Sequence, residues 1–188
     1  MNNFNFEGIT SDSTNSKTEE NQDYYIDLYV DKIGSGKVVG IRIIHKSISP
    51  NPYNDILITN TEQQVLDLTN SVRVRNGISA LEWSEKAQSS SRKHSEEMAN
   101  NNYFSHTDLN GKSSADRMDV EGITWSYCGE NIAAGYDDAV EVTFGWFQSS
   151  GHRKNMLNDN FTHLGVGVAF NKDSAYRTYY TQNFYKQR

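Results

Sequence analysis

The sequence predicts an α+β domain in which helices come first along the chain and paired strands come last. Three observations lead to this prediction. Apolar residues recur at helical spacing between residues 61 and 100, helix-capping side chains stand before several stretches, and two strand-like runs close the chain. A length of 188 residues fits one ordinary domain preceded by an extension.

The extension occupies the first third of the chain. Residues 1–22 are polar and predict a flexible leader. Residues 24–30 and 38–44 have strand-type composition on either side of a Gly-Ser-Gly turn, so they predict a hairpin, and prolines 50 and 52 mark a linker. The predicted boundaries are therefore a leader at 1–22, a hairpin with its linker at 23–60, and the main domain at 61–188.

Helix-start signals organise the main domain. Val65, Leu68 and Val72 share one face of the first predicted helix. In the second helix His94 points inward with Met98, and we interpret it as a hydrogen-bonded core histidine. The candidate capping residues are Thr61 with Gln64, then Ser84, then Ser113 with Asp116, and finally Asp137 or Asp138.

The last two predicted elements are strands. Residues 164–170 and 176–185 are rich in β-branched and aromatic side chains, and Asn171–Ser174 supplies the turn between them. Their closeness in the chain predicts an antiparallel pair.

Composition limits the classes of partner. A formal net charge of -6 argues against nucleic acid or an anionic membrane surface, and no apolar run approaches a membrane span. Cys128 is the only cysteine, so no intrachain disulfide is expected. The first 22 residues lack the charged head and apolar stretch of a signal peptide. The protein is therefore expected to be cytosolic, or to begin after an export signal that has been removed.

The most informative chemistry lies in two polar clusters and one upstream histidine. The clusters are Gly129–Asn131, which contains Glu130, and Gly151–Asn155, which contains His152; His106 stands upstream, where the helical pattern lapses. We predict that His106, Glu130 and His152 meet at the floor of one cleft.

Read together, these stretches resemble the CAP superfamily, whose domain is also called the SCP domain and whose members include cysteine-rich secretory, antigen 5 and pathogenesis-related proteins. The resemblance runs from about residue 61 to residue 185 and follows the family's order, in the low-cysteine form of the bacterial branch. It is carried by Asn70-x-x-Arg73, Leu81-x-Trp83, His94-x-x-x-Met98, Ser105-His106, Gly129-Glu130-Asn131-Ile132-Ala133, Trp146-x-x-Ser149-x-Gly151-His152-x-x-Asn155-Met156-Leu157, Gly165-Val166-Gly167 and Tyr180-Thr181-Gln182-Asn183-Phe184.

The resemblance implies a three-layer α-β-α sandwich with a central, mainly antiparallel sheet and a large open cleft, here with an N-terminal hairpin extension. That hairpin resembles the tail of a CAP-associated domain. The family resemblance also implies an exported protein, in the extracellular space or the cell envelope. Many members carry two histidines and two acidic residues in the cleft. Here His106, His152 and Glu130 match, while the second acid falls near Ser149, so the tetrad keeps three members.

Two imidazoles suit zinc or another divalent cation, with Glu130 either as third ligand or as the group that orients an imidazole. One expectation is a metal at His106, His152 and Glu130, in a cleft that also contains Ser149 and Asn155. The other is that Glu130 and Asn131 brace neighbouring loops through buried hydrogen bonds, in a domain that serves as a structural interaction module. The cleft is expected to bind an unidentified small ligand, lipid or peptide, with no catalytic residue assigned.

The alternative function is a histidine- or metal-assisted hydrolase of peptides or envelope components. Ser105 and Ser149 are near the histidines only in sequence, and a nucleophilic serine must meet a histidine in hydrogen-bonding geometry. Cys128 is interpreted as a packed thiol because no neighbouring cation favours its thiolate.

Overall fold

The structure is a computed structural model that describes residues 16–20, 23–46 and 55–188, and the chain divides into two compact units between Asn51 and Pro52. The two units are described separately. The predicted linker prolines, Pro50 and Pro52, lie outside the described residues.

The N-terminal unit is a three-stranded antiparallel sheet in the order β1-β2-β3. Its strands are β1 (Ser16–Glu20), β2 (Tyr24–Val30) and β3 (Val38–His45), so the predicted hairpin is confirmed. The prediction of a leader without structure is wrong for Ser16–Glu20, because main-chain pairing with β2 stabilises an extended segment whose side chains are polar. The rest of that predicted leader, residues 1–15 and 21–22, lies outside the described residues.

Asp31 organises the turn between β2 and β3. Its carboxylate accepts hydrogen bonds from the backbone N–H groups of Gly34 and Ser35, at 3.0 and 2.9 Å. Gly36 follows with φ at +64°, a left-handed conformation that glycine adopts without steric cost. The turn is therefore fixed by one side chain and one glycine.

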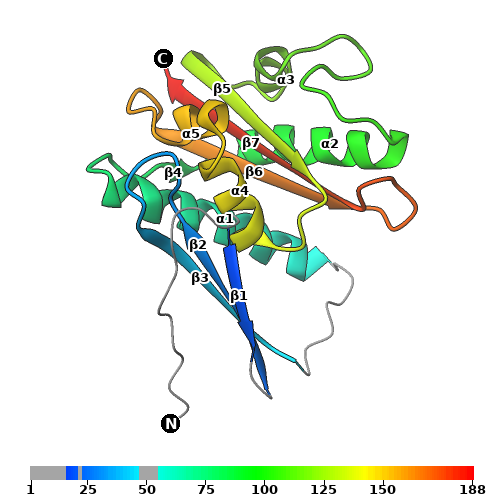
Figure 1. Cartoon of the computed structure of the whole chain (residues 1–188). Coiled ribbons are helices and arrows are strands. Elements are labelled where there is room, and N and C mark those ends of the chain that lie inside the picture. Colours follow the sequence, from blue (N-terminus) through cyan, green and yellow to red (C-terminus); the bar gives the residue numbers. More distant parts are fainter. Residues whose placement is uncertain (1–15, 21–22, 47–54) are drawn as a thin grey trace. The chain divides into compact units, whose positions relative to one another are not determined.

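The second unit contains a four-stranded sheet in the order β4-β6-β7-β5 (Figure 1). Strand β6 pairs antiparallel with β7 and parallel with the short β4, while β5 pairs antiparallel with β7 and forms one edge. The expected C-terminal hairpin is confirmed, as is the α+β class. In chain order the elements are α1 (Asp55–Arg75), β4 (Glu82–Trp83), α2 (Glu85–Asn101), α3 (Ser114–Val120), β5 (Trp125–Ala134), α4 (Ala139–Phe147), α5 (Ser150–Met156), β6 (His163–Phe170) and β7 (Thr178–Gln187).

Side chains of β7 alternate between two helical layers, as the two-residue period of a strand requires. On one face Thr181 contacts Ser95 of α2, with 2.8 Å between the hydroxyl oxygens. On the other face the Gln182 amide donates to Thr69 of α1 at 3.0 Å, and the Tyr180 ring packs edge-on against Trp146 of α4. The sheet is thus covered by helices on both faces, which gives the three-layer arrangement.

Helix α2 lies very close to β6 because glycines remove side chains at the contact. A Cβ built on Gly165 would lie 2.1 Å from the backbone nitrogen of Gln88, and one on Gly167 would lie 2.1 Å from that of Arg92. Ser91 and Ser95 of α2 donate hydrogen bonds to the carbonyls of these two glycines, both at 3.0 Å. Small residues on each side therefore set the distance between helix and sheet.

Three of the predicted helix starts are confirmed by their side-chain caps. Ser84, Ser113 and Asp138 accept hydrogen bonds from the backbone N–H groups of Ala87, Asp116 and Glu141, respectively. The predicted capping box at Thr61 is wrong, because α1 already begins at Asp55. The Thr61 hydroxyl lies inside the helix and donates to the Leu57 carbonyl at 2.7 Å.

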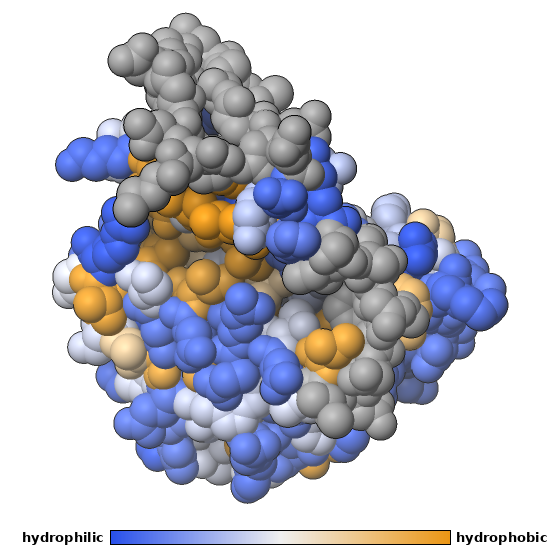
Figure 2. Space-filling view, turned by 90° about the horizontal axis from the view of Figure 1, so that it is seen from below, coloured by the Kyte–Doolittle hydropathy of each residue, from blue (hydrophilic) through white to orange (hydrophobic). Residues whose placement is uncertain are grey.

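Hydrophilic side chains predominate on the face shown in Figure 2, where apolar side chains form one larger group and several smaller patches. Within the described residues, no helix has the length and apolar character needed to span a bilayer.

Candidate functional site

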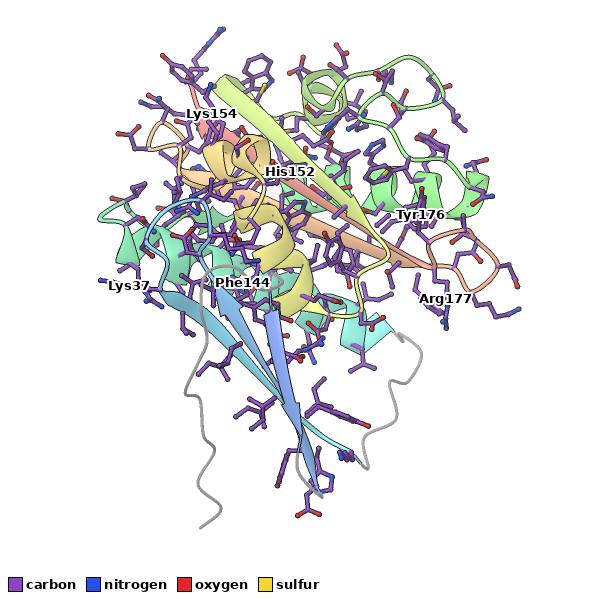
Figure 3. The ribbon with its side chains drawn as sticks, viewed as in Figure 1. Lys37, Phe144, His152, Lys154, Tyr176 and Arg177 are labelled. Atoms are coloured by element: carbon purple, nitrogen blue, oxygen red, sulfur yellow. The ribbon has the colours of Figure 1, made fainter. Side chains whose placement is uncertain are left out.

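A hollow of about 600 Å³ lies beside β5, the edge strand of the four-stranded sheet. Its walls come from the loop after α2, from β5, from α4 with the start of α5, and from the β6–β7 loop. Figure 3 labels two lining residues that are distant in sequence, His152 on α5 and Tyr176 in the β6–β7 loop. The lining residues are Phe104, Ser105, His106, Ile132, Ala133, Ala134, Tyr136, Gly145, Trp146, Ser149, His152 and Tyr176.

His106 and His152 therefore line the same hollow, and Ser149 lies there with them, whereas Glu130, which was also predicted at its floor, is not among the lining residues. His106 is the more exposed of the two, with 59% of its side chain accessible. His152 is half-buried, and its pKa is lowered by burial first and by the neighbouring His106 second. A lowered pKa keeps the His152 imidazole neutral at pH 7, with a nitrogen lone pair available.

Buried side chains hold the loop that carries His106. His94 is 1% exposed, and its Nε2 lies 2.9 Å from the Ser105 carbonyl, so this nitrogen carries the proton and donates it. Arg117 of α3 donates from Nη1 to the carbonyl oxygens of His106 and Lys112, at 2.9 and 3.0 Å. The interpretation of His94 as a hydrogen-bonded core histidine is confirmed, and its role is to place the loop.

Glu130 connects His106 to Arg117. Its Oε1 lies 2.7 Å from His106 Nδ1, and its Oε2 pairs with Arg117 Nη2. Since a carboxylate accepts, His106 Nδ1 carries the proton, and Nε2 is the nitrogen with a free lone pair. Only 3% of the Glu130 side chain is exposed, so the carboxylate faces inward and is not part of the lining.

Asn155, which the sequence predicted to lie in the cleft, is half-buried and is not among the lining residues. The Asn155 amide donates to the Glu130 carbonyl at 3.0 Å and to the Asn131 side-chain oxygen at 2.9 Å. Asn131 in turn donates to the His152 carbonyl at 3.2 Å and to Gln182 at 3.1 Å. These amides join the start of α5 to β5, which fixes His152 relative to the sheet.

The edge of β5 that is not paired with another strand receives hydrogen bonds from side chains of α4 and α5. Trp146 of α4 is 2% exposed and donates from its indole nitrogen to the Ile132 carbonyl at 3.1 Å. With the Asn155 contact, two outward-facing carbonyls of the edge strand have side-chain donors. The hollow is therefore bounded by a capped strand edge, which does not offer a row of free acceptors.

The donor set fits a cation held by two imidazoles better than one held by three side chains. Over the described ranges, no group of three or more His, Cys, Asp or Glu side chains is arranged to hold a metal ion. Both oxygens of Glu130 are already engaged, by His106 and by Arg117. Of the two roles that the sequence left open for Glu130, the geometry favours orienting His106 over ligating a metal.

Neither serine of the hollow is activated by a histidine. Ser149 stands at the N-cap of α5 without a side-chain capping bond, and the Ser105 hydroxyl accepts from the Thr107 backbone N–H at 3.1 Å. Within residues 55–188, no hydrogen bond joins either hydroxyl to an imidazole. The arrangement lacks the hydroxyl–imidazole contact of a serine nucleophile.

Cys128 packs beside an apolar cluster that includes Met118 and Tyr185. Burial first, and then Asp119, raises the pKa of its thiol, so the thiol form predominates at pH 7. The interpretation of Cys128 as a packed thiol is confirmed.

Arg117 is the site residue that the sequence reasoning missed. It is 8% exposed and contacts both Glu130 and the loop that carries His106. The available signal was its position four residues after the Ser113 cap, which places an arginine in a short helix whose partners are distant in sequence.

Comparison with other proteins identifies the family of this chain. Residues 66–184 match the CAP family, described as the cysteine-rich secretory protein family. The chain belongs to the CAP family. The resemblance seen in the sequence is thereby confirmed, including its bacterial character.

Two Bacillus subtilis proteins are similar in sequence. The uncharacterized membrane protein YlbC is 36% identical over 206 residues, covering 99% of this chain and 57% of YlbC. The uncharacterized protein YkwD is 43% identical over 106 residues, covering 56% of this chain and 41% of YkwD. The CAP chain described here thus spans about half the length of these relatives.

Two solved bacterial structures share the fold. An extracellular protein containing a SCP domain from Bacillus anthracis is 31% identical with a TM-score of 0.76, covering 92% of this chain and 60% of that one. A cysteine-rich secretory protein from Staphylococcus aureus is 19% identical with a TM-score of 0.70, covering 90% of this chain and 57% of that one. The second match supports the fold alone.

Proposed function

We propose that this chain is an extracellular or envelope-associated bacterial CAP-domain protein that binds a ligand or partner in the hollow beside β5, with a divalent cation between His106 and His152. The observation that carries the proposal is the contact of His106 Nδ1 with Glu130. It leaves Nε2 as the metal-binding nitrogen, in a hollow that the neutral His152 also lines.

The location follows from relatives. The Bacillus anthracis structure is described as an extracellular protein, and the Bacillus subtilis relative YlbC as a membrane protein. The first description supports a protein that acts outside the cytoplasm. This chain covers 57% of YlbC and 60% of the Bacillus anthracis chain. Because these relatives are longer, any activity of the whole protein is likewise a proposal.

The residues present suit zinc in two respects. A neutral imidazole whose other nitrogen is bonded to a carboxylate is the usual form of a zinc-ligating histidine. Because Arg117 pairs with one oxygen of Glu130, the Glu130 carboxylate orients His106 through its other oxygen and does not bind the metal. A bound zinc ion supplies Lewis-acid character, and solvent or a ligand group completes its coordination.

Isothermal titration calorimetry with zinc tests this proposal. We expect one site per chain, with affinity reduced at least about tenfold by His106→Ala and by His152→Ala. His45→Ala, in the N-terminal unit, is the matched control and should bind zinc as the wild type does. Unchanged affinity in both cleft variants would disprove the site.

A further inference from the structure

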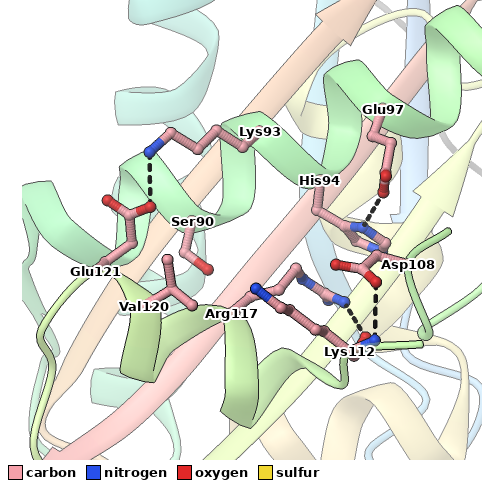
Figure 4. A pocket seen from close by; sticks show the side chains of 9 residues that line it. All are labelled: Ser90, Lys93, His94, Glu97, Asp108, Lys112, Arg117, Val120 and Glu121. Carbon is pink, nitrogen blue, oxygen red and sulfur yellow. Dashed lines mark hydrogen bonds and ion pairs between the residues drawn. The ribbon is translucent and has the colours of Figure 1, made fainter. Parts of the chain in front are cut away.

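A second, smaller hollow lies between α2 and α3 (Figure 4). Its volume is about 240 Å³, which corresponds to roughly eight water molecules at the density of the liquid. It shares no lining residue with the hollow beside β5. Besides His94, six of its lining side chains carry charge at pH 7, three of each sign: Lys93, Lys112, Arg117, Glu97, Asp108 and Glu121.

Two buried polar atoms in its wall have no hydrogen-bond partner among the described residues: Nε of Arg117 and Nδ1 of His94. Both residues are more than nine-tenths buried, at 8% and 1% exposure. Buried polar atoms are normally bonded, so these two atoms are expected to bond to water or to a ligand inside the hollow.

The two unpaired atoms, Nε of Arg117 and Nδ1 of His94, need hydrogen-bond partners of opposite kinds. Arg117 Nε–H is a donor on a permanent cation and requires an acceptor, ideally an anion. His94 donates from Nε2 to the Ser105 carbonyl, so its Nδ1 is an acceptor that requires a donor. Burial first, then Arg117, lowers the pKa of His94, which keeps the ring neutral and Nδ1 unprotonated.

The charged side chains of the hollow are distributed in the same way as the two unpaired atoms, with donors near Arg117 and acceptors near His94. Lys93 and Glu121 neutralise each other at 2.6 Å, whereas the Lys112 ammonium makes no ion pair within the described residues. Glu97 lies on the same helix as His94, and their side chains face each other in Figure 4. The Glu97 carboxylate lies 3.8 Å from His94 Nδ1. One part of the hollow therefore carries the Lys112 ammonium beside Arg117, whose guanidinium is already paired with Glu130. The Asp108 carboxylate lies in the same wall and accepts the Lys112 backbone N–H at 2.8 Å. Another part carries the Glu97 carboxylate, which also accepts from the Tyr103 hydroxyl.

We propose that this hollow binds a small zwitterion of the α-amino acid class, with its carboxylate toward Arg117 and Lys112 and its ammonium toward His94 and Glu97. An anion alone would leave the His94 acceptor to water, and a cation alone would leave the Arg117 donor to water, whereas a zwitterion pairs both. The volume admits a free amino acid and is below the range of larger organic ligands.

The test is an NMR titration of the full chain that follows the ring Cε1–H signals, of which five histidines give five. L-Alanine is compared with propionate and ethylamine, which lack the ammonium and the carboxylate, respectively. We expect alanine to shift the His94 signal saturably, leaving His45 unmoved, and to bind about tenfold or more tightly than either analogue. No saturable shift, or equal binding of all three compounds, would mean that water fills the hollow and would overturn the proposal.

Substitutions in and outside this hollow test whether alanine binds there. Lys112→Ala and Glu97→Gln should each weaken alanine binding about tenfold, while Lys154→Ala, an exposed lysine of α5, should not. His152→Ala should retain alanine binding, which separates this site from the proposed metal site. Unaltered affinity in both Lys112→Ala and Glu97→Gln would contradict the assignment even if alanine binds.

Discussion

Nδ1 of His106 lies 2.7 Å from Oε1 of Glu130, and the other oxygen of that carboxylate is paired with Arg117. One buried acid thus fixes the tautomer of a solvent-accessible imidazole and neutralises a buried guanidinium. The same contact is therefore expected to affect both stability and the proposed zinc binding.

Replacing Glu130 by Gln should be strongly destabilising, because it leaves the Arg117 guanidinium buried without its counter-charge. We expect the free energy of unfolding to fall by about 3–5 kcal/mol, measured by urea denaturation. Zinc affinity should fall roughly 10–100-fold through loss of the orienting contact to His106.

Glu82→Gln is the control for this prediction. The Glu82 side chain is 82% exposed and lies 3.5 Å from His163, so its loss should change stability by at most about 1 kcal/mol. Equal effects of the two substitutions would show that the buried contact of Glu130 contributes no more than a surface pair.

A second prediction concerns the contact between α2 and β6. Gly167→Ala should destabilise the domain by at least about 1–3 kcal/mol, because the new Cβ would overlap backbone atoms that cannot move independently. Gly151→Ala is the matched control, since a Cβ there meets nothing within 4 Å. It should leave stability unchanged or raise it by up to about 1 kcal/mol through helix propensity. Thermal unfolding of both variants measures the difference, and similar melting temperatures would contradict the packing argument.

Arg73 provides a third prediction. It is 1% exposed, and its guanidinium donates to four backbone carbonyls, those of Ser79, Met156, Asn158 and Phe161. Lysine keeps the charge but lacks the planar set of donors, so Arg73→Lys should cost about 2 kcal/mol or more in denaturant unfolding. Arg75→Lys, on the exposed side of the same helix, should change stability by less than about 0.5 kcal/mol. If Arg73→Lys were equally mild, the carbonyl contacts would be replaceable by water.

Acidification supplies the fourth prediction, through His94. Burial first, then Arg117, lowers the pKa of this imidazole, against the raising effects of Glu130, the Ser105 carbonyl and Glu97. The unfolded chain therefore binds a proton at higher pH than the folded chain does, and stability is lost as the pH falls below about 6.5. Urea unfolding at about pH 7 and about pH 5 should show a larger loss for the wild type than for His94→Gln. A loss of equal size would assign the acid sensitivity to other groups.

The order of elements was predictable where local chemistry decides the structure. Ser84, Ser113 and Asp138 are caps whose function depends on their immediate neighbours, and the turn at residues 171–174 brings the last two strands together. The three-layer arrangement rested on the resemblance to a known family, because single-sequence patterns do not specify which helix covers which face of a sheet.

Strand β5 and helix α5 were not predicted, for identifiable reasons. The middle of β5 carries Glu130 and Asn131, polar residues that are buried because Arg117 and Asn155 bind them from other elements. Helix α5 buries only Met156, so it lacks the apolar stripe on which a helix prediction depends. The prediction that Asn155 lies in the cleft was wrong for a related reason, because its amide is used to join α5 to β5.

The two imidazoles of the hollow are held by different helices, which has a consequence for assembly. His106 depends on α2 and α3 through His94 and Arg117, whereas His152 depends on α5 and the Asn131 amide. A partly folded chain with an intact sheet but an undocked α5 would hold only one of the two rings. Zinc uptake would therefore report the completion of folding, and cation binding and docking of the last helix would favour each other.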